Sequence, residues 1–257
     1  MTRLIHIFTL AAILLLTACA SSGDHDDPTS GLAAAEIYKE AKTHLDNGNY
    51  ESAIQFYEKL ESRFPYGRFA TRAQLEIAYA YYKFEEFETA ILSADRFIKL
   101  HPNHPHVDYA YYLRGLAGYN MSESFLGKLF NQDPTERDPK SARRSFQYFA
   151  ELVKKFPKSK YARDAVQRMT YLRNGLSKYE VHVAQFYYER EAYLAAANRC
   201  KYVVDNYQRT PSIADALSLM VKSYRKLELG KLADDALRVL ELNHPNHPEL
   251  AGLKTES

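Results

Sequence analysis

One spacing recurs along this chain and constrains its fold more than any other feature. Positions 50, 53 and 65 hold an aromatic residue, a small alanine and a proline. The same three kinds of residue recur 37 positions later, as Phe87, Ala90 and Pro102. Self-similarity at a period of 20 to 50 residues indicates an array of one supersecondary unit, in which each copy packs on its neighbours.

Two longer steps place further copies of this unit. The residues at 55–57 and 63–65 reappear 92 positions later as Gln147-Tyr148-Phe149 and Lys155-Phe156-Pro157. The pentapeptide His-Pro-Asn-His-Pro at 101–105 returns unchanged at 244–248, a step of 143, and Tyr193 and Ala196 stand at the same step from positions 50 and 53. These matches indicate five repeats.

Each repeat has the character of two helices joined by a turn. Apolar residues follow helical spacing, Gly48 stands at the first turn, and neither β-type alternation nor hairpin turn pairs occur. The unit resembles the tetratricopeptide repeat, whose usual period is 34 residues. A single helical hairpin cannot bury both of its apolar faces, so such units stack and leave a long groove. We therefore predict an all-α superhelical solenoid of about five tetratricopeptide-type hairpins, continuous over 32–252.

Two irregularities interrupt the array. The step between the prolines at 102 and 157 is 18 residues longer than the first period, which predicts an inserted loop over 119–140. This loop separates repeats 1 and 2 and the start of repeat 3, over 32–118, from the remainder of repeats 3–5, over 141–252. The helix before Tyr193 is predicted to be unusually long, over 161–191, with Gly175 as a candidate break.

The N-terminus carries a short apolar segment that ends at a cysteine. Arg3 precedes an apolar run from 5 to 16, and Thr17 and Ala18 are the small residues that a signal peptidase needs. A membrane-spanning helix is a rival interpretation, but a span needs about 20 apolar residues and this run has 12. A soluble secreted protein is the other rival, in which Cys19 is an ordinary residue.

The pattern resembles the bacterial lipobox. The resemblance implies that residues 1–18 are a cleaved signal peptide and that Cys19 carries an N-acyl chain and an S-diacylglycerol lipid. Residues 19–31, rich in Ser, Asp and Gly and then Ala, are expected to form a flexible tether. Ala20 differs from the aspartate that resembles an inner-membrane retention signal. We therefore expect a lipid-anchored protein on the periplasmic face of the outer membrane.

Charge and cysteine content exclude several function classes. The full chain has a net charge of +2, which leaves no broad electrostatic footprint for nucleic acid. If Cys19 is acylated, Cys200 has no partner for a disulfide, and its small-residue position in a helix indicates a buried packing thiol. A cluster of lysines and arginines at 140–144 and 154–160 has two interpretations, contact with lipid head groups or a solvated helix face.

The sequence contains no motif that indicates catalysis or metal binding. The histidines at 101, 104, 106, 244 and 247 lie in proline-containing turns, and no nearby cysteine or H-E-x-x-H spacing accompanies them. No glycine-rich phosphate loop or nucleophile elbow occurs. We expect no catalytic residue, no metal and no cofactor beyond the lipid on Cys19.

Several longer strings carry a more specific resemblance. The most specific are Tyr-Ala-Tyr-Tyr-Lys at 79–83, Tyr-Leu-Arg-Gly-Leu at 112–116, Arg-Asp-Pro at 137–139 and Asn-Arg at 198–199. With the lipobox and five repeats, the mature chain resembles the BamD family, the tetratricopeptide lipoproteins of the outer-membrane β-barrel assembly machine. The resemblance implies a non-enzymatic periplasmic scaffold. Its expected partners are the periplasmic domains of the barrel-forming subunit, other assembly lipoproteins and unfolded outer-membrane proteins.

The resemblance also implies two binding sites. Arg199, with Asn198 and Tyr188, corresponds to the contact with the barrel-forming subunit, on the fourth and fifth repeats; the alternative is a surface ion pair of little energetic weight. An aromatic client groove in the first two repeats is expected to contain Tyr66, Tyr79, Tyr82 and Phe84. The alternative there is packing between helices. Another repeat lipoprotein, such as a secretin pilotin or a cell-envelope adaptor, is the rival function.

Overall fold

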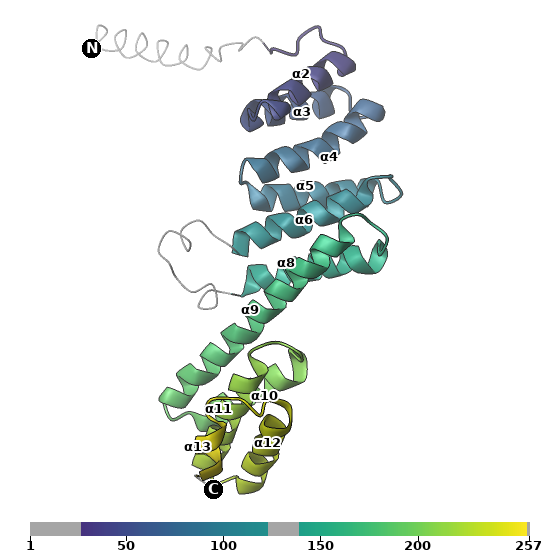
Figure 1. The fold of residues 1–257 in the computed structure, drawn as a ribbon. Helices are drawn as coiled ribbons and strands as arrows, with labels where there is room; N and C mark the ends of the chain where they lie inside the picture. The colour runs from purple at the N-terminus through teal and green to yellow at the C-terminus, as the bar shows by residue number, and fades with distance from the viewer. Residues whose placement is uncertain (1–26, 123–138, 256–257) are drawn as a thin grey trace, which may run out of the picture.

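The fold is a stack of antiparallel helical hairpins (Figure 1). The computed structural model describes residues 27–122 and 139–255, and in these ranges it contains eleven helices and no strand. Ten of the helices form five hairpins, which confirms the predicted all-α solenoid. The pairs are α2 (Ala34–Asp46) with α3 (Tyr50–Arg63), α4 (Arg68–Lys83) with α5 (Phe87–Leu100), α6 (Val107–Ser122) with α8 (Lys140–Lys155), α9 (Ala162–Glu189) with α10 (Tyr193–Asn206), and α11 (Ile213–Lys226) with α12 (Gly230–Asn243), followed by α13 (Leu250–Thr255).

The turn inside four of the hairpins has one repeated backbone geometry. Its second-last residue is left-handed, with φ of +79° at Gly48, +64° at Glu85, +60° at Glu191 and +59° at Glu228. The next residue then donates its N–H to a carbonyl five positions earlier, as Asn49 does to His44 at 2.9 Å. Three of these four positions hold glutamate, although glycine alone adopts this conformation without steric cost. Backbone packing, rather than the residue type, therefore fixes the turn.

The second helix of every hairpin ends in the same way. Five aromatic or histidine residues leave the helix with φ between −119° and −138° while each donates its N–H to the carbonyl four residues earlier. Proline follows in four of the five and cannot continue a helix. The five residues are Phe64, His101, Phe156, Tyr207 and His244. Their spacing confirms the register of five repeats.

Small residues let the helices approach closely. The alanines at the repeated position on the second helix, Ala53, Ala90, Ala196 and Ala233, are at most 1% exposed. The third repeat has the fully buried Ser145 instead, and a Cβ added to Gly118 of α6 would lie 3.3 Å from its Cβ. The α6–α8 pair therefore packs especially tightly.

The inserted segment begins later than predicted. Helix α6 continues to Ser122, so residues 119–122 are helical, and α8 begins at Lys140. The remainder of the predicted loop, 123–138, lies outside the described residues.

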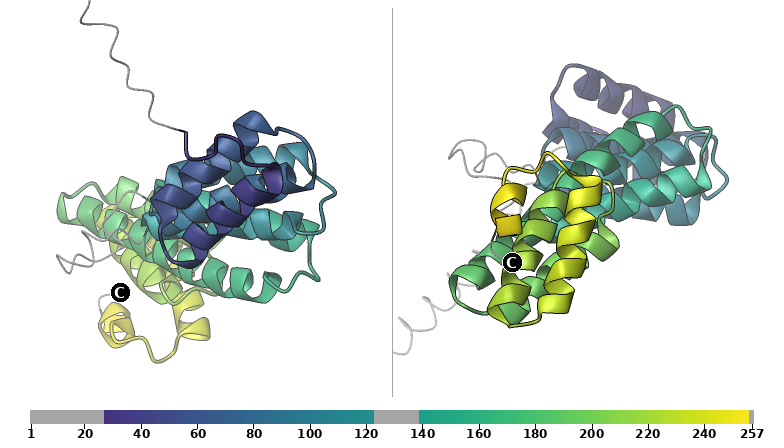
Figure 2. Two further views of the ribbon diagram at one scale, coloured as in Figure 1. Left: turned by 90° about the horizontal axis from the view of Figure 1, so that it is seen from above. Right: turned by 60° about the horizontal axis from the view of Figure 1, so that its bottom comes forward.

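Helix α9 joins two stacks. It is 28 residues long and continues through Gly175, so the predicted break at this residue is wrong. A Cβ at Gly175 would meet nothing within 4 Å, and packing along the helix outweighs the propensity cost of about 1 kcal/mol for one glycine. The N-terminal part of α9 packs on α8 and its C-terminal part on α10 and α11. Figures 1 and 2 show the two stacks on either side of it.

Candidate interaction surfaces

Three helices meet at one buried carboxylate where the two stacks join. Glu180 of α9 is fully buried. Nη2 of Arg143 on α8 donates to Oε1 of Glu180, and Nη1 of Arg199 on α10 donates to Oε2, both at 2.8 Å. A buried carboxylate is costly to desolvate unless it is paired and hydrogen-bonded, and here each oxygen has its own guanidinium. We call this group the Glu180 clamp.

The clamp sets the position of Arg199 without hiding it. The Arg199 side chain remains 44% exposed while it is bonded to Glu180. Asn198, the preceding residue of α10, is exposed. Tyr188 instead is partly buried, packs against the core cluster that contains Cys200, and forms an edge contact with Tyr193, with ring centroids 5.3 Å apart. The structure therefore keeps Asn198 and Arg199 at the surface and gives Tyr188 a packing role.

Glu180 and Arg143 were not identified from the sequence. Glu180 is separated by four residues from both Leu176 and Ala184, which are buried. A charged residue on an apolar helical stripe is a signal that a buried ion pair exists. No comparable signal identifies Arg143, because its partner lies 37 residues away in the chain.

The predicted aromatic client groove is not one site. Tyr66 is 91% exposed in the turn before α4, and Phe84 is 44% exposed just after that helix. Because α4 has 16 residues and a helix rises about 1.5 Å per residue, these two positions lie roughly 24 Å apart along it. Tyr79 and Tyr82 instead pack against buried residues of α4, α5 and α6, and Asn120 donates to the Tyr82 hydroxyl at 3.0 Å.

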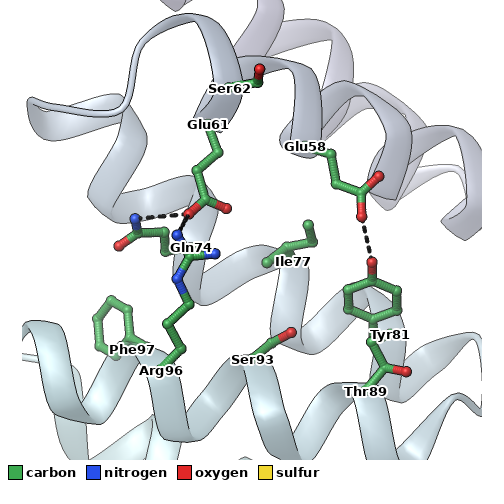
Figure 3. A pocket seen from close by; sticks show the side chains of 10 residues that line it. All are labelled: Glu58, Glu61, Ser62, Gln74, Ile77, Tyr81, Thr89, Ser93, Arg96 and Phe97. Atoms are coloured by element: carbon green, nitrogen blue, oxygen red, sulfur yellow. Dashed lines mark hydrogen bonds and ion pairs between the residues drawn. The ribbon is translucent and has the colours of Figure 1, made fainter.

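The first two repeats do contain a hollow, in a different place (Figure 3). It measures about 370 Å³ and lies between α3 and α5, with α4 behind it. Arg96 of α5 pairs with Glu61 of α3 at 2.6 Å, and the amide of Gln74 on α4 donates to the same carboxylate at 3.1 Å. Ile77 and Phe97 supply apolar surface. The hollow therefore offers charged and amide groups around a small apolar patch.

Tyr81 is the aromatic residue of α4 that borders this hollow. Its hydroxyl donates to Oε1 of Glu58 at 2.6 Å. Burial, and then the hydrogen bond to Glu58, raise the pKa of Tyr81 far above the ordinary value of a phenol. The phenol is therefore a neutral hydrogen-bond donor at any physiological pH, and it does not act as a base.

The thiol of Cys200 and the imidazole of His101 both pack against other parts of the protein. The Cys200 thiol is fully buried, which confirms the predicted packing role, and burial raises its pKa to about 12. His101 bonds to Gln74 at 2.6 Å and its ring packs on Phe97. Within residues 27–122 and 139–255, no three His, Cys, Asp or Glu side chains are placed to share a metal ion.

The predicted site of membrane attachment lies outside the described part of the chain. Cys19 lies there, with the whole predicted signal segment. Among the helices that the structure describes, none combines the length and apolar character needed to cross a bilayer.

Comparison with known proteins agrees with these features. Residues 31–240 match the model of the family YfiO, described as an outer membrane lipoprotein. The outer membrane protein assembly factor BamD of Neisseria gonorrhoeae is 46% identical over 247 residues, which cover 95% of this chain and 92% of that protein. The factor of the same name from Vibrio cholerae is 34% identical over 91% of this chain and 96% of its own.

Solved structures of repeat proteins also align with the chain. The TPR2AB domain of yeast Sti1, in a complex with pHSP90, covers 87% of this chain and 83% of its own, with a TM-score of 0.42 and 13% identity.

Proposed function

The chain belongs to the YfiO family of outer membrane lipoproteins, and from that membership we propose how its surfaces serve outer membrane protein assembly. It is a non-enzymatic assembly factor with a tetratricopeptide-type scaffold. The relatives share this role by name and span nearly the same length, which favours it over a secretin pilotin or another cell-envelope adaptor. The identity of the docking partner, the client surface and the anchor are parts of the proposal.

The proposed docking surface for the barrel-forming subunit lies on the fourth and fifth repeats. Arg199 and Asn198 on α10 carry it. Glu180 fixes the Arg199 guanidinium while its side chain stays 44% exposed; Arg143 is held and exposed to the same extent, so the choice of Arg199 rests on the family resemblance of the Asn198-Arg199 pair. A guanidinium has five N–H donors in a rigid fork, and arginine is enriched among the residues that dominate interface energetics. Held in this way, Arg199 loses less conformational freedom when it binds a carboxylate or carbonyl of the partner.

The proposed anchor is a lipid on Cys19 that holds the chain at the periplasmic face of the outer membrane. Stable anchoring needs at least two acyl chains, since each buried CH₂ contributes about 0.8 kcal/mol. The lipobox pattern and the family description support this part of the proposal.

The proposed client surface is the hollow between α3 and α5 rather than a line of aromatic residues. An unfolded outer-membrane protein presents free backbone N–H and C=O groups. Glu61, Gln74 and Arg96 provide both acceptors and donors at the rim, above the buried side chains of Ile77 and Phe97.

Purification from native membranes tests the proposed machine. A C-terminally tagged protein is extracted with mild detergent, and its companions are identified by mass spectrometry. Recovery of a stoichiometric barrel protein with periplasmic domains is the expected result. Recovery of a secretin, a polysaccharide exporter or peptidoglycan enzymes in its place contradicts the proposal.

Two matched variants test the docking residue. Arg199→Gln and Arg143→Gln each remove one of the two guanidinium groups on Glu180, so they disturb the clamp equally. We expect Arg199→Gln to weaken binding of the barrel-forming subunit's periplasmic domains at least tenfold and Arg143→Gln to change it less than twofold. Because both arginine side chains are 44% exposed, equal losses would contradict the assignment of the contact to Arg199 rather than Arg143. Unchanged binding in Arg199→Gln removes Arg199 from the interface.

A further inference from the structure

Positive charge is concentrated at a single turn of the solenoid. The segment 154–163, from the end of α8 to the start of α9, contains four lysines and one arginine in ten residues and no acidic residue. The whole chain has a net charge of only +2. The equivalent turn of the last repeat, 242–251, contains one glutamate and neither lysine nor arginine. We call residues 154–163 the basic turn.

The cations of the basic turn are exposed and are not neutralised by the protein. Lys154, Lys158, Lys160 and Arg163 are exposed, and within the described ranges none of the four forms an ion pair with a carboxylate. The ammonium of Lys155 donates to the Tyr111 hydroxyl at 2.6 Å, which is a neutral partner. The positive potential of the basic turn is therefore directed to solvent and attracts anions.

A shallow hollow accompanies this charge. It measures about 440 Å³ and lies between the α5–α6 turn and the basic turn. Lys155 and Lys158 line it on one side, and His104, Pro105 and Asp108 line it on the other. The Ser159 hydroxyl donates to the Asp108 carboxylate at 2.6 Å, so the lysine ammonium groups are what this hollow offers to an anion, and no buried charge preorganises it for one defined ligand.

The basic turn lies on the edge of the solenoid at which the chain enters. The backbone carbonyl and hydroxyl of Thr29 bind Arg63 at the C-terminal end of α3. Figure 1 shows that α2 begins on the same side of the stack as the α8–α9 turn. The eight residue-to-residue steps from Cys19 to Asp27 span at most about 28 Å when fully extended. The lipid anchor of the proposed function would therefore keep the first hairpin near a bilayer, on the side of the stack that also carries the basic turn.

We propose that the basic turn docks on anionic phospholipid head groups of the membrane that holds the anchor. The proposal rests on the proposed attachment through Cys19. Lysine predominates over arginine in the turn. A lysine ammonium is a mobile point charge, so it is better suited to binding the phosphates of a fluid layer than to binding one carboxylate in a fixed position. The attraction of each lysine to an anionic surface decays within the Debye length, so it needs close contact and weakens with salt. Such a contact would fix the orientation of the scaffold relative to the membrane.

Lysine footprinting on the native protein tests this contact. The full protein, purified from its own membranes, is incorporated into nanodiscs of phosphatidylcholine alone or with 30% phosphatidylglycerol. Lysines are then acetylated briefly and their modification is quantified by mass spectrometry. In acidic discs we expect at least threefold lower modification at Lys154, Lys158 and Lys160, reversed by 0.5 M NaCl. Lys226 and Lys231, which are exposed on α11 and α12, serve as internal controls and should not change.

Two charge-matched variants separate the basic turn from net charge. Lys154, Lys158 and Lys160 are changed to Gln in one, and Lys39, Lys226 and Lys231 in the other. Protection of Lys155 in acidic discs should disappear in the first variant and persist in the second. Loss in both, or equal modification in the two disc types, overturns the proposal. So does protection that appears only when an acidic partner protein is added. The mass of the Cys19 peptide reports the anchor separately, so failure of the anchor is distinguishable from failure of the basic turn.

Discussion

A Cβ placed on Gly115 of α6 would lie 2.4 Å from the ring of Phe149 on α8. Real Cβ atoms essentially never approach another atom this closely, and Phe149 is fully buried, so its ring has no free space to enter. Glycine at this position is therefore a packing requirement of the α6–α8 pair.

The change Gly115→Ala should destabilise the fold. Overpacking of this kind typically costs 1–3 kcal/mol, which we expect as a loss in the free energy of unfolding measured with urea. Gly175→Ala is the matched control, because nothing lies within 4 Å of its added Cβ and alanine favours helix by about 1 kcal/mol. A destabilised Gly175→Ala or an unchanged Gly115→Ala would contradict this view of the packing.

Replacing glutamate by glycine at the left-handed turn position should stabilise the fold. Glu85 has a φ of +64°, a conformation that costs an L-residue roughly 1–2 kcal/mol and glycine much less. We expect Glu85→Gly to raise the free energy of unfolding by about 1 kcal/mol. Glu40→Gly, at an exposed position within α2, should lower it by about the same amount. Two changes of the same sign would show that φ does not govern the outcome.

Arg114 should contribute far more to stability than a surface arginine. Its side chain is 9% exposed, bonds to Asp95 and Glu151 at 2.6 Å each, and lies over the Tyr148 ring. We expect Arg114→Ala to cost about 2–4 kcal/mol by chemical denaturation, slightly below the usual cost of breaking a fully buried pair because both carboxylates can rehydrate. Arg238→Ala, which removes an exposed pair with Asp235, should change stability by less than about 0.5 kcal/mol. Similar losses in both variants would refute this ranking.

The C-terminal end should loosen in acid. Burial acts to raise the pKa of Glu249, but hydrogen bonds from Lys222 and Ser218 outweigh it and lower the pKa below its ordinary value. A carboxylate with a lowered folded-state pKa contributes stability above its unfolded pKa and loses it as the pH falls through the folded pKa. The protection factors of the α13 amides, which correct for the intrinsic pH dependence of exchange, should therefore fall below about pH 4.5. Glu249→Gln should exchange faster at pH 7 and show a weaker dependence on pH; an identical pH profile would exclude Glu249 as the cause.

Cys200 should resist alkylation in the native protein. Its thiol is fully buried and its pKa is raised to about 12, so the nucleophilic thiolate is nearly absent at pH 8. We expect no iodoacetamide adduct on the Cys200 peptide after an hour at pH 8, and complete modification in 6 M guanidinium chloride. Rapid labelling without denaturant would show that α10 opens frequently.

The repeat register was predictable because the packing of each hairpin requires particular residue types at fixed positions. A buried alanine where two helices touch and a proline after the second helix recur in most repeats, and the sequence steps of 37 and 143 followed from them. The left-handed turns were predictable only at Gly48. Glu85, Glu191 and Glu228 adopt the same conformation under the constraint of packed helices, which no local pattern reveals.

The sites were predicted less well than the fold. Helical spacing shows which residues share a face of one helix, but it does not show which neighbour covers that face. Tyr79 and Tyr82 were therefore placed in a groove, whereas they pack against the core. Arg199 was found through resemblance to a family, yet its partner Glu180 comes from a different helix and Arg143 from a third.

The unbroken α9 makes the protein a rigid spacer. Its 28 residues correspond to a rod of roughly 42 Å that belongs to both stacks at once. Leu172 is part of the core of one stack and Ala184 part of the core of the other, so neither stack can rotate about a loop or be removed as a domain without uncovering apolar surface. A segment bound to the first two repeats is therefore held at a fixed distance from a partner bound to the last two.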